Sequence, residues 1–79
     1  MVDATEIFHD LCWLLECELA TLEELKDMKR TSKRSIERHE KIARPMVIKV
    51  WAYCRDYAFG IDPRKSRVAE AVRRLDDGE

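Results

Sequence analysis

Apolar residues recur every three to four positions along most of this 79-residue chain, which predicts helices. Asp3 or Thr5 is expected to cap the first helix, and Glu6 in its first turn suits the helix dipole. This helix extends to about Ala20. One face of it, at about 100° per residue, is expected to point into the core and consists of Ile7, Phe8, Leu11, Leu14, Leu15 and Leu19.

A second apolar strip lies on the opposite side of the same helix. Trp13, Cys17 and Ala20 line up along it, with His9 and Glu16 interrupting the strip. An indole on the side away from the core is covered either by another helix of the chain or by a partner. In a chain this short we favour a partner.

The middle of the chain predicts a helix, a tight turn and another helix. Thr21 and Glu24 have the spacing of a capping box, which opens a helix. The apolar pattern stops over residues 29–35 and then resumes, and Thr31 or Ser32 is placed to cap the second helix. A single long helix through this region is the alternative.

Proline and glycine bracket the next helix. Pro45 stands at its first position and Gly60 just beyond its end, whereas the β-forming residues 46–53 leave a strand as the alternative. Asp62 and Pro63 open a last helix. The broad apolar face before Gly60 is expected at the centre of the fold or in a dimer interface. It consists of Val47, Val50, Trp51, Cys54, Tyr57 and Ala58.

Residues 21–39 resemble the helix-turn-helix of bacterial and phage DNA-binding regulators. They share a Leu-Glu-Glu-Leu helix, a short turn ending in Ser, and a second helix rich in Lys and Arg. They depart from the family at Lys26 and Arg30, where it has a small residue and a glycine. In that family the second helix enters the major groove. The resemblance and the surrounding bases imply contacts to double-stranded DNA by Arg30, Ser32, Lys33, Arg34, Ser35, Glu37, Arg38 and Lys41.

These patterns together predict an all-α fold with one domain over residues 1–79. We expect a small bundle of four helices with a helix-turn-helix-like central segment. Two Gly and two Pro are too few for a turn-rich all-β fold. The expected helical stretches are about 4–20, 22–29, 33–44, 46–59 and 63–75.

The net charge of −1 conceals a strong polarity along the chain. Residues 1–28 carry eight acids and one base, whereas residues 29–44 carry seven bases and two acids. The basic segment would attract phosphates, which favours a DNA-binding transcriptional regulator. The alternative is that the acidic and basic segments complement each other within the fold.

A small helical inhibitor or adaptor that docks on a regulatory protein is the other hypothesis. The acidic first third and the apolar strips support it, because an acidic helix can cover the basic surface of a regulator. Both hypotheses allow a homodimer, through which a chain of this size gains core. The interface residues expected are Trp13, Cys17, Val50, Trp51 and Tyr57.

Other classes of function find little support. No nucleophile–base pair, metal-ligand spacing or glycine-rich loop is present, so we expect no enzyme activity, metal, cofactor or small-molecule substrate. The apolar runs are far shorter than the ~20 residues of a membrane span, and the acidic N-terminus does not resemble a signal peptide. Three cysteines, an odd number, suit a reducing cytoplasm.

Overall fold

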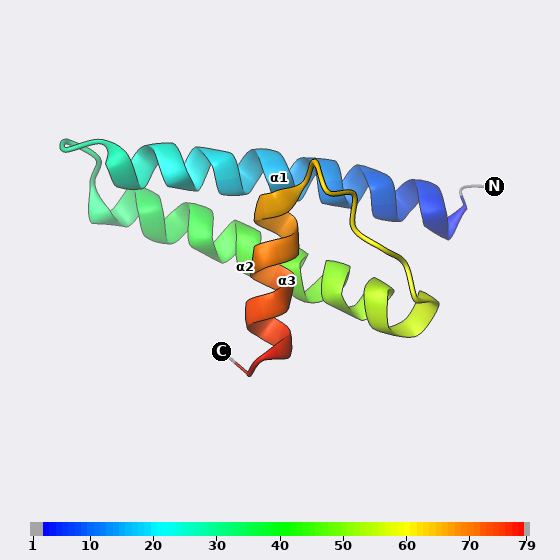
Figure 1. The fold of residues 1–79 in the computed structure, drawn as a ribbon. Coiled ribbons are helices and arrows are strands. Elements are labelled where there is room, and N and C mark those ends of the chain that lie inside the picture. Colours follow the sequence, from blue (N-terminus) through cyan, green and yellow to red (C-terminus); the bar gives the residue numbers. More distant parts are fainter. Residues whose placement is uncertain (1–2, 79) are drawn as a thin grey trace.

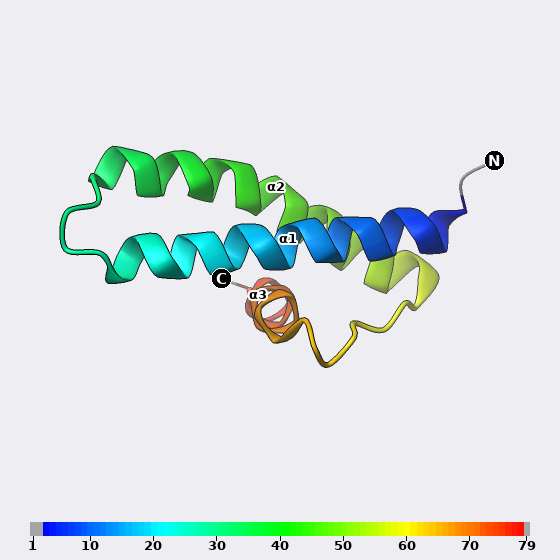
Figure 2. The ribbon, with the colours of Figure 1, turned by 90° about the horizontal axis from the view of Figure 1, so that it is seen from above.

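The computed structural model describes residues 3–78, and this part of the chain is helical, without strands. Three helices follow in order: α1 (Ala4–Asp27), α2 (Lys33–Tyr57) and α3 (Ser66–Asp76). The long helices α1 and α2 run antiparallel side by side, and α3 crosses one face of the pair (Figures 1 and 2). The molecule measures 42 × 29 × 21 Å. The all-α class is confirmed, but four helices is wrong.

The five expected helical stretches become three helices because two of the expected breaks do not form. Thr21 does not open a new helix, and its hydroxyl instead donates a hydrogen bond to the Cys17 carbonyl, 3.0 Å away within α1. Threonine satisfies its hydroxyl in this way inside helices. Leu22 then extends the core stripe one further heptad beyond Leu15, so α1 gains burial by continuing.

The second expected break lies at Pro45, which stands inside α2 rather than at the start of a helix. Its missing N–H leaves the Lys41 carbonyl without its helical donor, a cost of about 3 kcal/mol in a helix interior. Ala43 and Val50, on either side of Pro45, are both buried against the same core. Burial on both sides offsets the lost hydrogen bond and keeps α2 continuous.

Capping residues define where the long helices begin. The Asp3 carboxylate accepts a hydrogen bond from the Thr5 backbone N–H at 3.4 Å, and the Ser32 hydroxyl accepts one from the Ser35 N–H at 3.2 Å. The expectations for Asp3 and Ser32 are therefore confirmed. Residues 28–32 form the short turn of the α1–α2 hairpin.

The core takes one fully buried side chain from each helix: Leu15, Val50 and Val68. The first helix, however, turns a different face inward than its pattern predicted. Ile7 and Leu14 are 39 % and 60 % exposed, because α3 packs on the side of α1 that carries Cys12 and Glu16. The buried core consists of Phe8, Cys12, Leu15, Leu22, Ala43, Val50 and Val68.

The end of α2 lies earlier than Gly60. Ala58 adopts the left-handed conformation, φ 56°, that closes the helix. The chain then turns back so that Phe59 packs on Phe8, with ring centroids 5.0 Å apart. The Asp62 carboxylate caps a turn by accepting from the Arg64 N–H at 2.9 Å, and α3 begins only after that turn.

Glu16 of α1 provides the N-terminal cap that α3 lacks. Lys65, at the N-cap position of α3, makes no side-chain capping bond. The carboxylate of Glu16, buried to 9 % exposure, instead accepts hydrogen bonds from the Val68 backbone N–H and the Arg67 guanidinium, each at 3.0 Å. A negative charge at a helix N-terminus satisfies free N–H groups and opposes the dipole. This contact fastens α3 across the hairpin.

Candidate nucleic-acid interface

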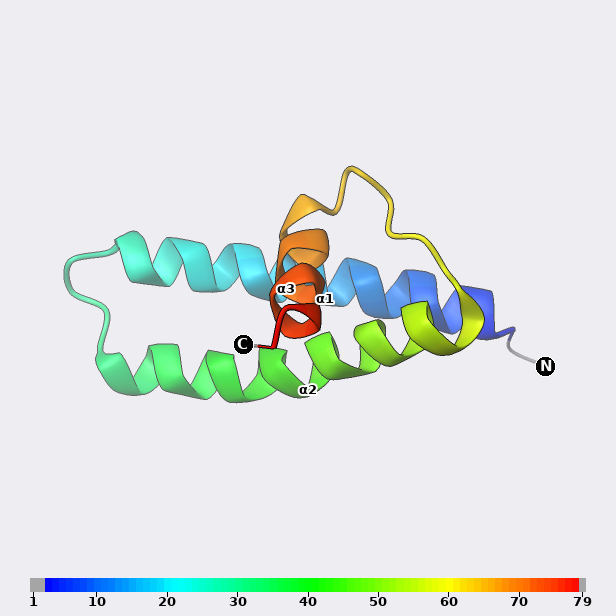
Figure 3. The same ribbon diagram turned by 60° about the horizontal axis from the view of Figure 1, so that its bottom comes forward.

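Exposed cations surround the hairpin turn and the first half of α2. All seven bases of residues 29–44 are exposed, and we call them the basic surface: Lys29, Arg30, Lys33, Arg34, Arg38, Lys41 and Arg44. The turn lies at the end of the hairpin away from the segment joining α2 to α3 (Figure 3). Two members, Lys29 and Arg44, were missing from the DNA contacts expected from the sequence, although the charge count had already included them.

The basic surface is not paired with carboxylates of the described part of the chain. Within residues 3–78, none of its seven members forms an ion pair. The Lys and Arg residues after Arg44 differ, because each of them except Lys49 forms an ion pair with a carboxylate. The paired bases are Arg55, Arg64, Lys65, Arg67, Arg73 and Arg74.

Antiparallel packing brings the acidic and basic segments side by side, but no described acid of the first segment pairs with a Lys or Arg of the second. The side-chain polar contacts between the described residues of the two segments include an ion pair of Lys26 with Glu40, 3.4 Å, and a bond of His39 Nδ1 with the Glu18 carboxylate, 2.5 Å. Neither involves a Lys or Arg of the basic surface. Complementation within the fold therefore does not account for these seven cations.

Cations also stand at the end of α2 where they are least favourable. Lys33 and Arg34 open the helix, and its first turn contains no acid. A helix N-terminus carries partial positive charge, so adjacent cations raise the energy of the helix and an anion lowers it. Free backbone N–H groups of the same turn are available to such an anion. The field at this end of α2 is therefore unfavourable to its own cations and favourable to a negative charge.

Most residues expected to contact DNA are exposed, whereas two serines among them are engaged in a hydrogen bond within the chain. Glu37 is exposed, as are the expected bases Arg30, Lys33, Arg34, Arg38 and Lys41. Ser32 and Ser35 are bonded to each other, with their hydroxyls 3.1 Å apart. The antiparallel arrangement of α1 and α2 differs from the helix-turn-helix, in which two helices meet at about 90–120° (Figure 2).

The expected interface residues also separate. Val50 is fully buried in the chain's own core and offers no surface to a partner. Trp51 is half-buried, and its indole N–H donates to Asp76 of α3 at 3.3 Å. Trp13 and Tyr57 remain 61 % and 57 % exposed, and Cys17 is exposed as well.

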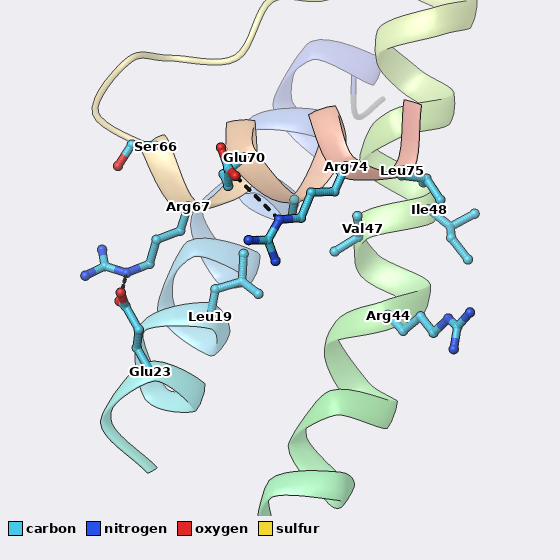
Figure 4. A pocket seen from close by; sticks show the side chains of 11 residues that line it. Leu19, Glu23, Arg44, Val47, Ile48, Ser66, Arg67, Glu70, Arg74 and Leu75 are labelled. Atoms are coloured by element: carbon cyan, nitrogen blue, oxygen red, sulfur yellow. Dashed lines mark hydrogen bonds and ion pairs between the residues drawn. The ribbon is translucent and has the colours of Figure 1, made fainter. Parts of the chain in front are cut away.

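A groove lies between the three helices near the middle of the hairpin. It has a volume of about 700 Å³, and its walls include Leu19, Val47 and Leu75. Arg67 and Arg74 at its rim pair with Glu23 and Glu70, respectively (Figure 4). A second hollow of about 410 Å³ shares Leu19 and Val47 and continues toward the hairpin turn. Because the rim of the groove carries both acidic and basic side chains, it shows no preference for a ligand of either charge.

The cysteines show no arrangement for catalysis. All three are free thiols, and burial raises the pKa of Cys12 to about 11 and also raises that of Cys54. A raised pKa keeps a thiol protonated and unreactive. No three His, Cys, Asp or Glu side chains within the described range are placed to hold a metal ion. None of the three helices is both long and apolar enough to cross a membrane.

Comparison with known proteins gives no relative: no family model, curated protein or solved structure matches this chain.

Proposed function

We propose that this chain is a small DNA-binding transcriptional regulator that holds duplex DNA with its basic surface. The observation that carries the proposal is seven exposed Lys and Arg side chains in sixteen residues, none with an ion pair among residues 3–78. Unpaired cations release condensed counterions from DNA when they bind phosphates, and this release drives association.

The turn and the first turns of α2 form the contact in this proposal. The resemblance to a helix-turn-helix assigns base contacts to Lys33 and Arg34, which project at the N-terminal end of α2. Because α1 lies antiparallel to α2, the hairpin approaches DNA with its tip, and the remaining cations bind flanking phosphates. The mode is therefore helix-turn-helix-like in sequence and hairpin-like in geometry.

Duplex DNA suits this surface better than a single strand. No aromatic residue occurs in residues 21–44, so the surface has no platform on which unpaired bases can stack. The three free thiols suit a reducing compartment, and the proposal places the protein in the cytoplasm.

The test compares binding of a labelled DNA duplex by wild type and by Lys33→Ala and Arg34→Ala variants, using fluorescence anisotropy at several salt concentrations. Each variant should bind more weakly, and the slope of log K against log salt should fall by about 1. Arg55→Ala is the matched control, because Arg55 is an exposed base on the same helix that already pairs with Asp56. Circular dichroism checks that helicity is unchanged.

Equal weakening by Arg55→Ala would mean that only overall charge matters, and this would contradict the assigned surface. Absence of duplex binding at low salt would remove the proposal altogether.

A protein-binding inhibitor or adaptor is the second candidate, favoured by the exposure of Trp13. This indole is 61 % exposed on the acidic helix α1, and the Lys65 Nζ lies 5.5 Å from its ring centroid. Affinity capture from the native host, with and without nuclease, separates the two candidates. A partner that survives nuclease treatment and is lost in Trp13→Ala would favour protein binding.

A further inference from the structure

The face of the α1–α2 pair opposite α3 exposes large aliphatic side chains. Ile7, Leu14 and Ile42 are 39 %, 60 % and 48 % exposed. No other element of residues 3–78 covers this face (Figure 2). Single exposed aliphatic residues are ordinary, but a group of them on one face of a small protein marks a contact surface.

Helical periodicity places these residues on that face. Glu16 marks the side of α1 toward α3, and Ile7 precedes it by nine residues, about two and a half turns, so Ile7 points the other way. Leu14 is two full turns from Ile7. On α2, Trp51 bonds α3 and Ile42 precedes it by the same nine residues.

Opposite charges border the two halves of this strip. Asp10 lies between Ile7 and Leu14, three residues after one and four before the other. Lys49 follows Ile42 by two turns. Neither Asp10 nor Lys49 forms an ion pair with another described residue. The strip is therefore acidic along α1 and basic along α2.

Two contacts fix which residues of the antiparallel helices lie level with one another. Glu18 bonds His39 at 2.5 Å, and the Phe8 ring lies 6.0 Å from that of Tyr53. Counting from these contacts places Asp10 level with residues 47–51 of α2. Lys49 is the middle residue of that range.

We propose that a second copy of this chain docks on this strip, face to face, about a twofold axis parallel to the helices. This axis places α1 of one copy against α2 of the other. Rotation about it does not shift residues along the helices, so residues at the same height in one copy remain at the same height across the interface. Asp10 of each copy then faces Lys49 of the other, and the aliphatic residues meet between them. An axis perpendicular to the helices would instead lay α1 on α1, with acids facing acids.

The dimer proposal does not depend on DNA binding, but a dimer would change the surface available to DNA. Because the axis runs parallel to the helices, both hairpin turns lie at the same end of the dimer. The two basic surfaces then form one larger cationic region. Loss of the dimer and loss of duplex binding are separate measurements, so either proposal can fail alone.

Sedimentation equilibrium tests the pairing through charge reversal. Wild type should sediment near twice the 9.4 kDa of one chain. Asp10→Lys and Lys49→Asp should each raise the dimer dissociation constant about tenfold or more, because each puts like charges together twice. An equimolar mixture of the two variants should regain the dimer, since each contact in the mixed dimer joins Lys to Asp. Asp77→Lys on the far end of α3 is the matched control and should not change the mass.

Three outcomes would overturn the proposal. Wild type could be monomeric at every concentration, or its dimer could be unaffected by both reversals and by Leu14→Asp. The third is a mixture that fails to regain the dimer although circular dichroism shows both variants folded.

Discussion

At the scale of single residues, Lys33 and Arg34 stand where their charges destabilise α2. Both are cations at the positive end of the α2 dipole, and no acid stands in that turn. Ordinary helix design places acids there, as Glu6 does in α1. A bound phosphate would supply the missing negative charge.

Replacing one of these cations by an acid should therefore stabilise the fold. Lys33→Glu should raise the free energy of unfolding by about 1 kcal/mol, because it turns an unfavourable dipole interaction into a favourable one. Urea unfolding measures this change. Lys41→Glu is the control with the same change of charge, and it should give no such gain, because Lys41 lies beyond the first two turns of α2. Equal gains in both variants would contradict the dipole account.

The thiol of Cys12 gives the protein a weakness at high pH. Its side chain is 2 % exposed, and burial is the largest cause of the rise in its pKa from 9.0 to about 11. Between these two values the unfolded chain releases the proton while the folded chain keeps it. Stability is therefore full below pH 9 and falls as pH rises.

Between pH 9 and pH 11, loss of the Cys12 thiol proton in the unfolded chain should lower the free energy of unfolding by about 2 kcal/mol. Chemical denaturation at several pH values measures the loss, and in Cys12→Ala the decline over this range should be smaller by that amount. Cys17→Ala, which removes an exposed thiol outside the core, is the matched control. Identical declines in wild type and Cys12→Ala would contradict the assignment.

At the scale of elements, Glu16 joins α3 to the hairpin. The buried Glu16 carboxylate accepts hydrogen bonds from the Val68 N–H and the Arg67 guanidinium, whereas the exposed Glu23 carboxylate bonds to Arg67 alone. Removing a buried acceptor leaves its donors unsatisfied.

Glu16→Ala should therefore lower the free energy of unfolding by about 2 kcal/mol, whereas Glu23→Ala should cost less than about 1 kcal/mol. Denaturation curves measure both. Trp51 fluorescence should also change in Glu16→Ala, since the indole bonds Asp76 of α3 and would lose that partner as α3 loosens. Equal costs in the two variants would show that Glu16 is not the cap of α3.

The sequence predicted the helices but not which sides of each helix pack against the others. The 3.6-residue period identified helical residues, and the caps at Asp3 and Ser32 were correct. Which stripe faces inward depends on where α3 crosses, and no local pattern in α1 carries that information. The helical period therefore predicts Ile7 and Leu14 in the core, and in the sequence Glu16 only interrupts an apolar strip. Local rules predict a helix start at Pro45, because they do not include the buried contacts of Ala43 and Val50 on either side of it.

At the scale of the whole molecule, charge separates by region. The bases from Arg55 onward form ion pairs with carboxylates. Among residues 3–78, Asp10 of α1 forms no ion pair, and neither do the seven cations of the hairpin turn and first half of α2. Their positions on one helix and its preceding turn were visible in the sequence. Their lack of partners emerged only from the fold, because pairing depends on which elements meet.

Binding of a DNA duplex as a function of salt tests the central claim most directly. The wild-type chain should bind at low salt and weaken as salt rises, with a slope of log K against log salt approaching about −6 if all seven cations contact phosphates. The double variant Lys33→Glu, Arg34→Glu should lose this binding while remaining folded. Wild-type binding that is absent at low salt, or independent of salt, would contradict the account.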